Sequence, residues 1–406
     1  MSVHYDPKDP AVIADPFPAL RRLQAEDPIH WSSTLGSWVL TRYDHVKMAL
    51  NDPRFSADRI SPFLEHERAR GHGSLGELGR TVGLWAVFTD PPQHTRLRAV
   101  MSRGFTSRSV ESLRPRVEEI VDGLLDRVMP TGRLDLIRDF AYPLPITVIG
   151  DLIGVSRDDA DQLKQWSDDL AAFVGSAVTT PDKYARASRS VREMGDYFRR
   201  LADARRARPT SDIMSALVAS EPRADTLGEE ELVATCMLLL FAGHETTTNV
   251  IGNGMLALMR HPDQYEAWRD DPSLTPTAIE ELVRYDGPGQ ALVRIAATVV
   301  ELDGQRLARG DRVFLMINAA NRDPRRFTDP DRLDLRRDPN PHITFGHGIH
   351  YCVGAPLARL ELSVAIPALL RRLPGLAPTD GPLEWIDSLV FRGVRSLPAT
   401  FRAGRR

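Results

Sequence analysis

Apolar and polar positions follow helical spacing over most of the chain. Between residues 117 and 128 apolar side chains recur every three or four positions, and residues 147–153 continue this pattern. Residues 158–174 and 182–206 have the pattern of two amphipathic helices, the second rich in arginine on its polar side. The most apolar run, residues 232–259, follows three acidic residues that favour a helix N-terminus. The pattern predicts a mainly α protein.

A minor β part is expected at two places. Residues 29–31 and 38–41 flank Leu35-Gly36, which is typical of a short hairpin. Residues 292–300 and 312–317 are expected to be strands around a hairpin turn at Asp303-Gly304. Further helices are predicted at residues 277–285 and 355–370. No repeat or low-complexity linker divides the sequence, so we predict a single domain over residues 1–406.

Composition and charge exclude several classes of function. The chain has 42% hydrophobic and 26% charged residues and a net charge of −3, so no basic field indicates nucleic-acid binding. His244, Glu245 and Asn249 interrupt the most apolar run and would be costly in lipid, which favours a core helix over a membrane span. The two cysteines, Cys236 and Cys352, fit a reducing compartment. We expect a cytoplasmic monomer that binds neither nucleic acid nor membrane.

One loop carries the strongest chemical signal, residues 345–354, with the sequence FGHGIHYCVG. Its three glycines, of which Gly354 is the last, allow the backbone to approach a flat ligand closely. A proline at position 356 suits a first helical turn, so Cys352 should lie just ahead of a helix N-terminus that favours thiolate. Phe345 offers an aromatic wall, and His350 could donate to a ligand carboxylate. The loop therefore predicts a thiolate directed at a metal centre.

Two other interpretations of the loop remain open on these residues alone. A single cysteine is often only a small buried hydrophobe. Zinc is the second alternative, because His342, His347 and His350 cluster with Cys352. Structural zinc sites usually pair their ligands, however, and no second cysteine lies nearby in the sequence.

A second candidate lies inside the apolar run, where residues 242–246 read AGHET. Gly243 followed by Thr246 predicts a groove, since one side chain is absent and the hydroxyl can bond to a carbonyl one turn back. Glu245 and Thr246 then form an acid–alcohol pair suited to proton transfer. They could equally be hydrogen-bonded core residues. The HExxH zinc motif fails, because Thr248 occupies its second histidine position.

Two further residue pairs have helical spacing. Glu281 and Arg284 are three apart and share a helix face, which by itself indicates only a surface salt bridge. His94 and Arg98 follow Asp90-Pro91-Pro92 and are four apart, a good clamp for a carboxylate or a solvated helix face.

Together these segments resemble the cytochrome P-450 superfamily. Residues 345–354 match every fixed position of its FGxGxHxCxG haem loop, and residues 242–246 resemble its AGx(D/E)T segment. Glu281 and Arg284 resemble its ExxR pair, and residues 90–98 its DPPxHxxxR segment. The resemblance implies the triangular, mainly α cytochrome P-450 fold with a minor β part. It also implies that Cys352 is the axial ligand of the iron of heme b, as in these enzymes generally.

The resemblance assigns further roles. Glu245 and Thr246 would deliver protons to dioxygen, and Arg332 would join Glu281 and Arg284 in a network that braces the cysteine loop. The haem-contacting residues would be His94, Arg98, Arg294, Phe345, His350, Cys352 and Gly354. By analogy, the walls of the substrate pocket would include Leu84, Trp85, Val87, Phe88, Leu239, Ala242, Gly243, Leu292, Val293 and Phe391.

The implied activity is that of a soluble bacterial-type monooxygenase. One atom of O2 would be inserted into a hydrophobic small molecule by hydroxylation or epoxidation. Two cysteines cannot hold an iron–sulfur cluster and no flavin-binding segment is recognised, so electrons are expected from a separate ferredoxin or flavodoxin with its reductase. Arg103, Arg108 and Arg359 are expected to dock that acidic partner. The alternatives are a peroxide-driven peroxygenase and a haem-binding protein without catalysis.

Overall fold

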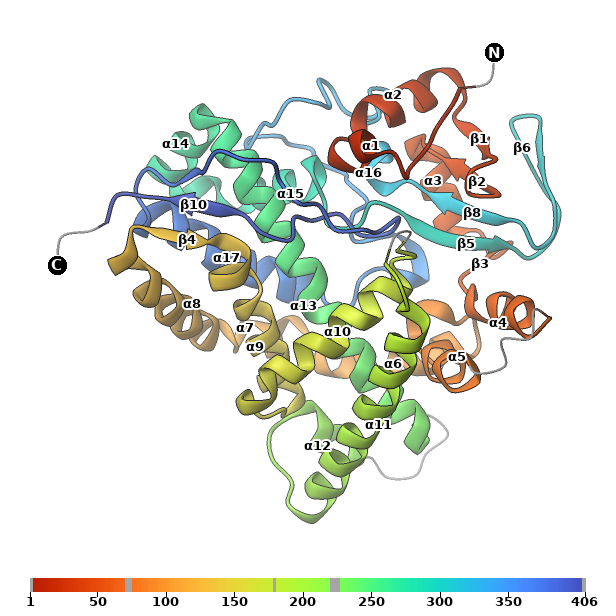
Figure 1. Cartoon of the computed structure of the whole chain (residues 1–406), viewed down its shortest axis with the longest axis horizontal. Helices are drawn as coiled ribbons and strands as arrows, with labels where there is room; N and C mark the ends of the chain where they lie inside the picture. Colours follow the sequence, from red (N-terminus) through yellow and green to blue (C-terminus); the bar gives the residue numbers. More distant parts are fainter. Residues whose placement is uncertain (1–2, 70–74, 178–179, 220–226, 404–406) are drawn as a thin grey trace.

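Helices make up most of the protein, and the outline is roughly triangular (Figure 1). The computed structural model describes residues 3–69, 75–177, 180–219 and 227–403. The helices are α1 (Pro10–Ala14), α2 (Phe17–Glu26), α3 (Tyr43–Asn51), α4 (Ile60–Ala69), α5 (Gly76–Gly83), α6 (Gln93–Gly104), α7 (Ser107–Glu111), α8 (Arg114–Val128), α9 (Pro143–Ile153), α10 (Ala160–Val174), α11 (Lys183–Ala207), α12 (Ile213–Val218), α13 (Glu229–Arg260), α14 (Pro262–Asp270), α15 (Thr275–Tyr285), α16 (Ile317–Ala320) and α17 (Ala355–Arg372). Every helix expected from the sequence is present, which confirms the mainly α class.

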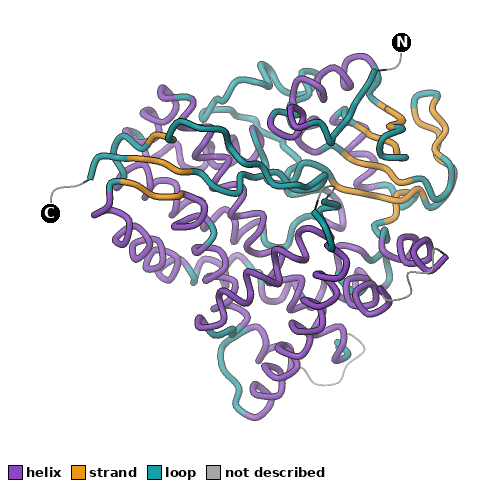
Figure 2. Tube along the Cα trace, viewed as in Figure 1, coloured by secondary structure: helices purple, strands orange, loops and turns teal. Residues whose placement is uncertain are grey.

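The main sheet lies at one side of the molecule, and the smaller β4–β10–β9 sheet lies at the opposite side, near the C-terminus (Figure 2). The main sheet has the order β1-β2-β8-β5-β3, in which β2 and β8 are parallel and the other pairs antiparallel. Its strands are β1 (Ile29–Ser32), β2 (Ser37–Leu40), β3 (Phe55–Ser56), β5 (Leu292–Ala296) and β8 (Arg312–Leu315). A smaller sheet joins β4 (Arg133–Asp135), β10 (Pro398–Thr400) and β9 (Ala377–Pro378), and β6 (Val300–Leu302) pairs with β7 (Gln305–Leu307).

The expected hairpin at β5 and β8 differs in its details. These two strands do pair, but they end at Ala296 and Leu315, earlier than predicted. Gly310, with a φ of +91°, turns the chain where the two strands separate. Asp303 and Gly304, with φ of +44° and +81°, form the turn of the separate β6–β7 hairpin. Residues 317–320 are helical because the chain turns into α16 there.

Helix α13 is the centre of the main hydrophobic core. It spans 32 residues and is packed against α9, α11, α15 and α17. At its start the carboxylate of Glu231 accepts a hydrogen bond of 3.0 Å from the Gly228 N–H, which is the N-terminal role expected of the acidic residues. Within the part of the chain that the structure describes, none of the helices combines the length and apolar character that crossing a bilayer requires.

Candidate functional site

The cysteine loop runs from Phe345 to the start of α17 and is held by its own backbone. The Cys352 N–H donates to the Phe345 carbonyl at 2.8 Å. Gly346 and Gly348 have φ of +76° and +69°, a conformation that side chains disfavour. A Cβ on Gly348 would also lie 2.6 Å from Oδ1 of Asn51, so this position requires glycine for space as well.

Cys352 lies in a recess. The residue is exposed, yet enough protein surrounds its sulfur that desolvation raises the pKa of the thiol. Both observations hold when a side chain lines an internal hollow. The N–H groups of Gly354 and Ala355, at the start of α17, and the guanidinium groups of Arg98 and Arg359 act in the opposite direction and lower this pKa. The predicted placement ahead of a helix N-terminus is therefore confirmed.

An ion pair braces the loop from behind. Arg359 on α17 donates to both oxygens of Glu280, at 2.6 and 2.8 Å, and its guanidinium lies 4.3 Å from the centre of the Phe345 ring. Glu280 also contacts Nε2 of His342 at 2.9 Å. These partners lower the pKa of Glu280 to about 2. The charge of Arg359 is thus largely compensated, which weakens its expected role in docking an electron donor.

His342 is accordingly engaged away from Cys352, which argues against the zinc interpretation. No group of three metal-binding side chains is found within residues 3–69, 75–177, 180–219 and 227–403.

Glu281 and Arg284 form a fully buried ion pair on α15. Two hydrogen bonds of 2.7 and 2.8 Å join them, and both side chains are 0% exposed. The pair is therefore a buried salt bridge and not the surface salt bridge that the spacing alone indicated. The prediction that Arg332 is the third member of this network is wrong for its side chain. Its side chain is exposed, and only its carbonyl takes part, accepting from Arg284 at 3.2 Å. The second guanidinium comes from Arg337, whose Nε lies 3.1 Å from Glu281. The pattern around Arg332 carried no sign of Arg337, because Arg337 and Glu281 are 56 positions apart in the sequence.

Four basic side chains predicted to hold carboxylates come together. The rings of His94 and His350 lie 4.1 Å apart between centroids, and Arg294 and Arg98 affect the pKa of both. Desolvation lowers the pKa of His350 to about 3 and that of Arg294 to about 10. Arg294 is 5% exposed, and no ion pair of Arg98 or Arg294 occurs among the described residues. Asp90 is the carboxylate that acts on Arg294, and it is already bonded to Ser56 and Ala57.

Between its two solvent-exposed ends, helix α13 is open at one stretch. Residues 232–241 and 247–258 are buried, whereas Ala242 is exposed and Glu245 and Thr246 are partly so. In a helix enclosed by neighbours, this exposure marks an internal hollow. The Thr246 hydroxyl donates to the Ala242 carbonyl at 3.2 Å, as expected. Gly243 has a different role from the one predicted: a Cβ there would lie 2.7 Å from Ile149, so the glycine permits close packing of α13 on α9.

Glu245 is a carboxyl group with an unusual environment. Burial and the negative charge of Asp168 raise its pKa to about 7, while a hydrogen bond of 3.3 Å from Asn249 opposes that rise. The neighbouring His244 faces away, with Nδ1 at 2.8 Å from the Leu240 carbonyl and its ring against Tyr142. Glu245 and Thr246 are therefore the polar pair of this helix that adjoins the hollow.

Several of the predicted pocket residues surround Phe241, which sequence reasoning did not single out from its apolar run. The Phe241 ring lies 5.5 Å from Trp85 and 5.9 Å from Phe391, and Trp85 stacks on Phe88 at 6.0 Å. Trp85 is 0% exposed, so it supports this aromatic wall from behind. The other predicted members differ in setting: Leu239 and Val293 are buried, Leu84 is partly buried, Val87 is 42% exposed, and Leu292 packs into the core beneath the sheet.

These residues fit a haem. The Cys352 sulfur lies near two backbone N–H groups, as a thiolate ligand of iron would require. Four basic side chains lie together with too few protein carboxylates to pair with them, so they could bind the two propionates of a haem. The open stretch of α13 provides an apolar face. Cys352 would hold the iron, and His94, Arg98, Arg294 and His350 would hold the propionates. Fold and site thus define the class of thiolate-ligated haem proteins.

The chain belongs to the cytochrome P450 family, whose model, described as Cytochrome P450, matches residues 29–387. It is an oxidoreductase of that family, which implies a haem-iron cofactor, O2, a small-molecule substrate and redox partners. The chain is 45% identical over 404 residues to the cytochrome P450 monooxygenase PikC of Streptomyces venezuelae, covering 97% of this chain and 92% of that protein.

Other similar proteins extend this picture. The chain is 41% identical over 392 residues to vitamin D(3) 25-hydroxylase of Pseudonocardia autotrophica, covering 95% of this chain and 94% of that protein. The crystal structure of CalO2 superposes with a TM-score of 0.91 at 34% identity, covering 99% of this chain and 100% of that one. These likenesses confirm the triangular, mainly α cytochrome P450 fold.

Proposed function

We propose that this enzyme contains heme b ligated by Cys352 and inserts one atom of O2 into a hydrophobic small molecule by hydroxylation or epoxidation. The observation that carries the proposal is the pair formed by Glu245 and Thr246 at the open stretch of α13, with the pKa of Glu245 raised to about 7. A protein that only bound haem would have no use for a proton donor placed beside its ligand pocket.

The chemistry of the pair follows from its hydrogen bonds. Because the Thr246 hydroxyl donates a hydrogen bond to the Ala242 carbonyl, its oxygen still has lone pairs that can accept a hydrogen bond from another group. A carboxyl group whose pKa lies near neutrality can both release and regain a proton at that pH. Glu245 can thus supply protons, and the Thr246 oxygen can orient a water by accepting a hydrogen bond from it. The haem, when bound, supplies the activation of O2 itself.

An apolar substrate is supported by the aromatic side chains grouped around Phe241. Compounds of terpenoid, polyketide, fatty or aromatic type fit such a wall. The names of relatives agree in part: one is a vitamin D(3) 25-hydroxylase, and another, 36% identical, is a polyketide biosynthesis cytochrome P450, PksS, of Bacillus subtilis.

Electrons would come from a ferredoxin or flavodoxin and its reductase. Arg103 and Arg108 are exposed, and α7, which carries Arg108, packs against α17, the helix that follows Cys352. Their positive charge on this side suits an acidic partner. Arg359 serves mainly Glu280 and is left out of this docking surface.

The test compares two threonines that are neighbours on α13. Thr246→Ala removes the hydroxyl at the hollow, whereas Thr247→Ala removes a buried hydroxyl that bonds the Gly243 carbonyl at 3.4 Å. In the reconstituted system with ferredoxin, reductase and ¹⁸O₂, Thr246→Ala should lower product formed per NADPH about tenfold or more, by the usual contribution of positioned proton transfer. Thr247→Ala should retain it.

The outcome separates the alternatives. Label from ¹⁸O₂ in the product supports monooxygenation. Turnover with hydrogen peroxide but not with O2 and reductant would instead establish a peroxygenase. No oxidised product from any member of a hydrophobic compound library, with haem bound, would leave a haem-binding protein.

A further inference from the structure

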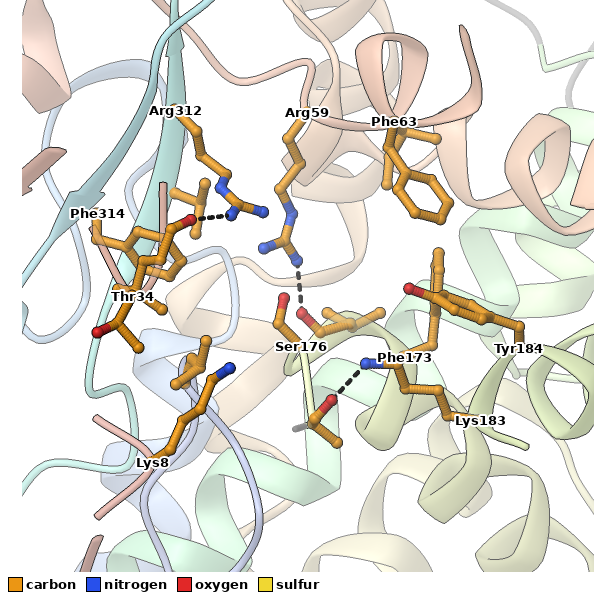
Figure 3. A pocket seen from close by; sticks show the side chains of 16 residues that line it. Lys8, Thr34, Arg59, Phe63, Phe173, Ser176, Lys183, Tyr184, Arg312 and Phe314 are labelled. Carbon is orange, nitrogen blue, oxygen red and sulfur yellow. Dashed lines mark hydrogen bonds between the residues drawn. The ribbon is translucent and has the colours of Figure 1, made fainter. Parts of the chain in front are cut away.

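A pocket of about 360 Å³ lies beside the predicted substrate pocket, and positively charged side chains line it. Its wall comes from the N-terminal segment, the turn between β1 and β2, α4, the end of α10, the start of α11 and the strands β5 and β8 (Figure 3). Parts of the chain that are far apart in sequence therefore meet here. None of the functions proposed above uses this pocket.

Four cations face the space. Lys8, Arg59, Lys183 and Arg312 all line the pocket, and Figure 3 shows their nitrogen ends converging on its middle, where the Ser176 hydroxyl also points. No aspartate or glutamate is among the described residues that line it. Converging charges of one sign repel each other in the empty pocket, and an anion would relieve that repulsion.

The hydrogen bonds of these cations orient them without neutralising them. Arg59 donates to the Val174 carbonyl at 2.7 Å, Lys183 donates to the Ala177 carbonyl, and Arg312 donates to Ser37 Oγ at 2.8 Å. All three acceptors are uncharged. Over the described ranges of the chain, none of the four cations is within ion-pair distance of a carboxylate. Asp387 is the carboxylate whose field reaches Lys183.

Arg59 is the most constrained of the four. Burial and the positive charges of Arg294 and Arg312 lower its pKa to about 10, so at neutral pH it is still charged but poorly solvated. A charged group in this condition gains more from an anionic partner than one in bulk water.

Much of the remaining wall of the pocket is apolar. Phe63, Phe173 and Tyr184 form an aromatic group with ring centroids 5.8 to 6.1 Å apart. At its inner side the Arg59 guanidinium lies 4.6 Å from the centre of the Phe88 ring, which belongs to the predicted substrate pocket. Val293, the residue before Arg294, lines this pocket and was also predicted to line the inner one.

We propose that the substrate is an amphiphile with an anionic end, a carboxylate or a phosphate, which Arg59, Lys183, Arg312 and Lys8 hold in this outer pocket while the apolar part extends past Phe88 towards the haem site. The inference deepens the proposed function and depends on it for the oxidation step. Because the anchored end is fixed, oxidation should occur away from the charged group.

The binding test uses a matched series of ten-carbon ligands with the haem-loaded protein. Decanoic acid, decyl phosphate, decan-1-ol and decylamine share one chain and differ in their end group. Isothermal titration calorimetry should give affinities for the acid or the phosphate, or both, at least about tenfold above that for the alcohol, with the amine weakest. A preference for acid over phosphate, or the reverse, identifies the end group. Equal affinity for all four ligands overturns the inference.

Variants locate the effect. Lys183→Gln and Arg59→Gln should each reduce the affinity for the preferred anion about tenfold and leave that for decan-1-ol unchanged. Arg208→Gln, an exposed arginine at the C-terminal end of α11, is the control and should change neither. If Arg59→Gln does not fold, Lys8→Gln at an exposed position provides the same comparison. Anion preference that survives both Lys183→Gln and Lys8→Gln contradicts this site.

Failure of this inference and failure of the proposed function give different results. Calorimetry reads ligand binding without turnover, so an anion-selective protein that oxidises nothing keeps the pocket and refutes the monooxygenase. A protein that oxidises neutral substrates but binds the acid, the phosphate and the alcohol equally well supports the monooxygenase and refutes the anion-binding pocket.

Discussion

At the scale of single residues, Glu245 gives the sharpest expectation, because its folded-state pKa of about 7 lies above its ordinary value of 4.5. Between these two values the folded protein keeps a proton that the unfolded chain releases. The contribution of Glu245 to stability is therefore most favourable below pH 4.5 and declines as the pH rises through 7. Glu245→Gln removes this titration.

The variant should thus gain stability relative to the natural protein as the pH is raised from about 4.5 to 8, by at most about 3 kcal/mol. Urea unfolding at several pH values, followed by far-ultraviolet circular dichroism, measures the difference, and the other titrating groups cancel in it. A difference that does not vary with pH would show that Glu245 has an ordinary pKa in the folded protein.

Arg337 and Arg332 show that the sequence alone could not predict which arginine side chain contacts Glu281. Both lie in the same arginine-rich coil, and the resemblance favoured Arg332, yet the side chain that reaches Glu281 belongs to Arg337. Which guanidinium points inward depends on the path of the coil, and the turn at Asp329, with a φ of +45°, is part of that path. Local pattern does not encode such a path.

Exchanging each arginine for leucine distinguishes the two positions. Arg337→Leu leaves the buried carboxylate of Glu281 with one guanidinium, and should cost about 2–4 kcal/mol of unfolding free energy. Arg332→Leu removes an exposed side chain and should change stability by less than about 0.5 kcal/mol. Denaturant unfolding of both variants measures the two changes in unfolding free energy. Equal losses of stability would show that the Arg332 side chain contributes to the network as much as that of Arg337.

At the scale of elements, the contact between α13 and α9 depends on Gly243. A Cβ at this position would lie 2.7 Å from Cγ1 of Ile149, so Gly243→Ala should force the helices apart locally and cost about 1–3 kcal/mol. The matched control is Gly123→Ala in the middle of α8, where the new Cβ meets nothing within 4 Å. There the better helix propensity of alanine should stabilise the protein by about 1 kcal/mol.

Thermal or urea unfolding of the two variants measures the contrast. A stabilising effect of both substitutions would mean that α9 yields easily and that Gly243 is present for another reason. The prediction also bears on function, since displacement of α13 would shift Thr246 and Glu245, so the yield of product per NADPH should fall with Gly243→Ala alone.

The long helices were predictable from the sequence, whereas short elements such as α7, α12, β3 and β9 were not expected. Helices such as α8 and α13 follow from apolar periodicity over many residues. The β5–β8 pair was found, but its ends were not, because Gly310 and the separate β6–β7 turn interrupt a run of strand-forming residues. Short strands offer too few residues for the pattern to fix their boundaries.

At the scale of the whole molecule, pairing across the fold decides which predicted residues act together. Arg294 on β5, His94 on α6 and His350 in the cysteine loop were proposed one by one, and the fold gathers them. The outer pocket with Arg59, Lys183 and Arg312 had no signal in the sequence, since its walls come from segments that have no common motif. Motifs of a family reveal its shared chemistry, whereas the residues that select a substrate emerge only in three dimensions.

The side of the molecule near Cys352 supports one last expectation, which concerns the electron donor. Arg108 is exposed on α7, which packs against α17, and charge reversal to glutamate replaces attraction by repulsion for an acidic ferredoxin. Arg108→Glu should raise the KM for ferredoxin roughly three- to tenfold, and more at low salt than at high salt, while the Kd of the substrate stays constant. Arg208→Glu, just after the C-terminal end of α11, makes the same charge change and should leave the KM unaltered. Arg359→Glu should behave differently from both, because it places a second carboxylate against Glu280 and loosens the loop around Cys352, so that stability falls together with electron transfer. If Arg108→Glu leaves the KM for ferredoxin unchanged at low salt, the donor docks elsewhere.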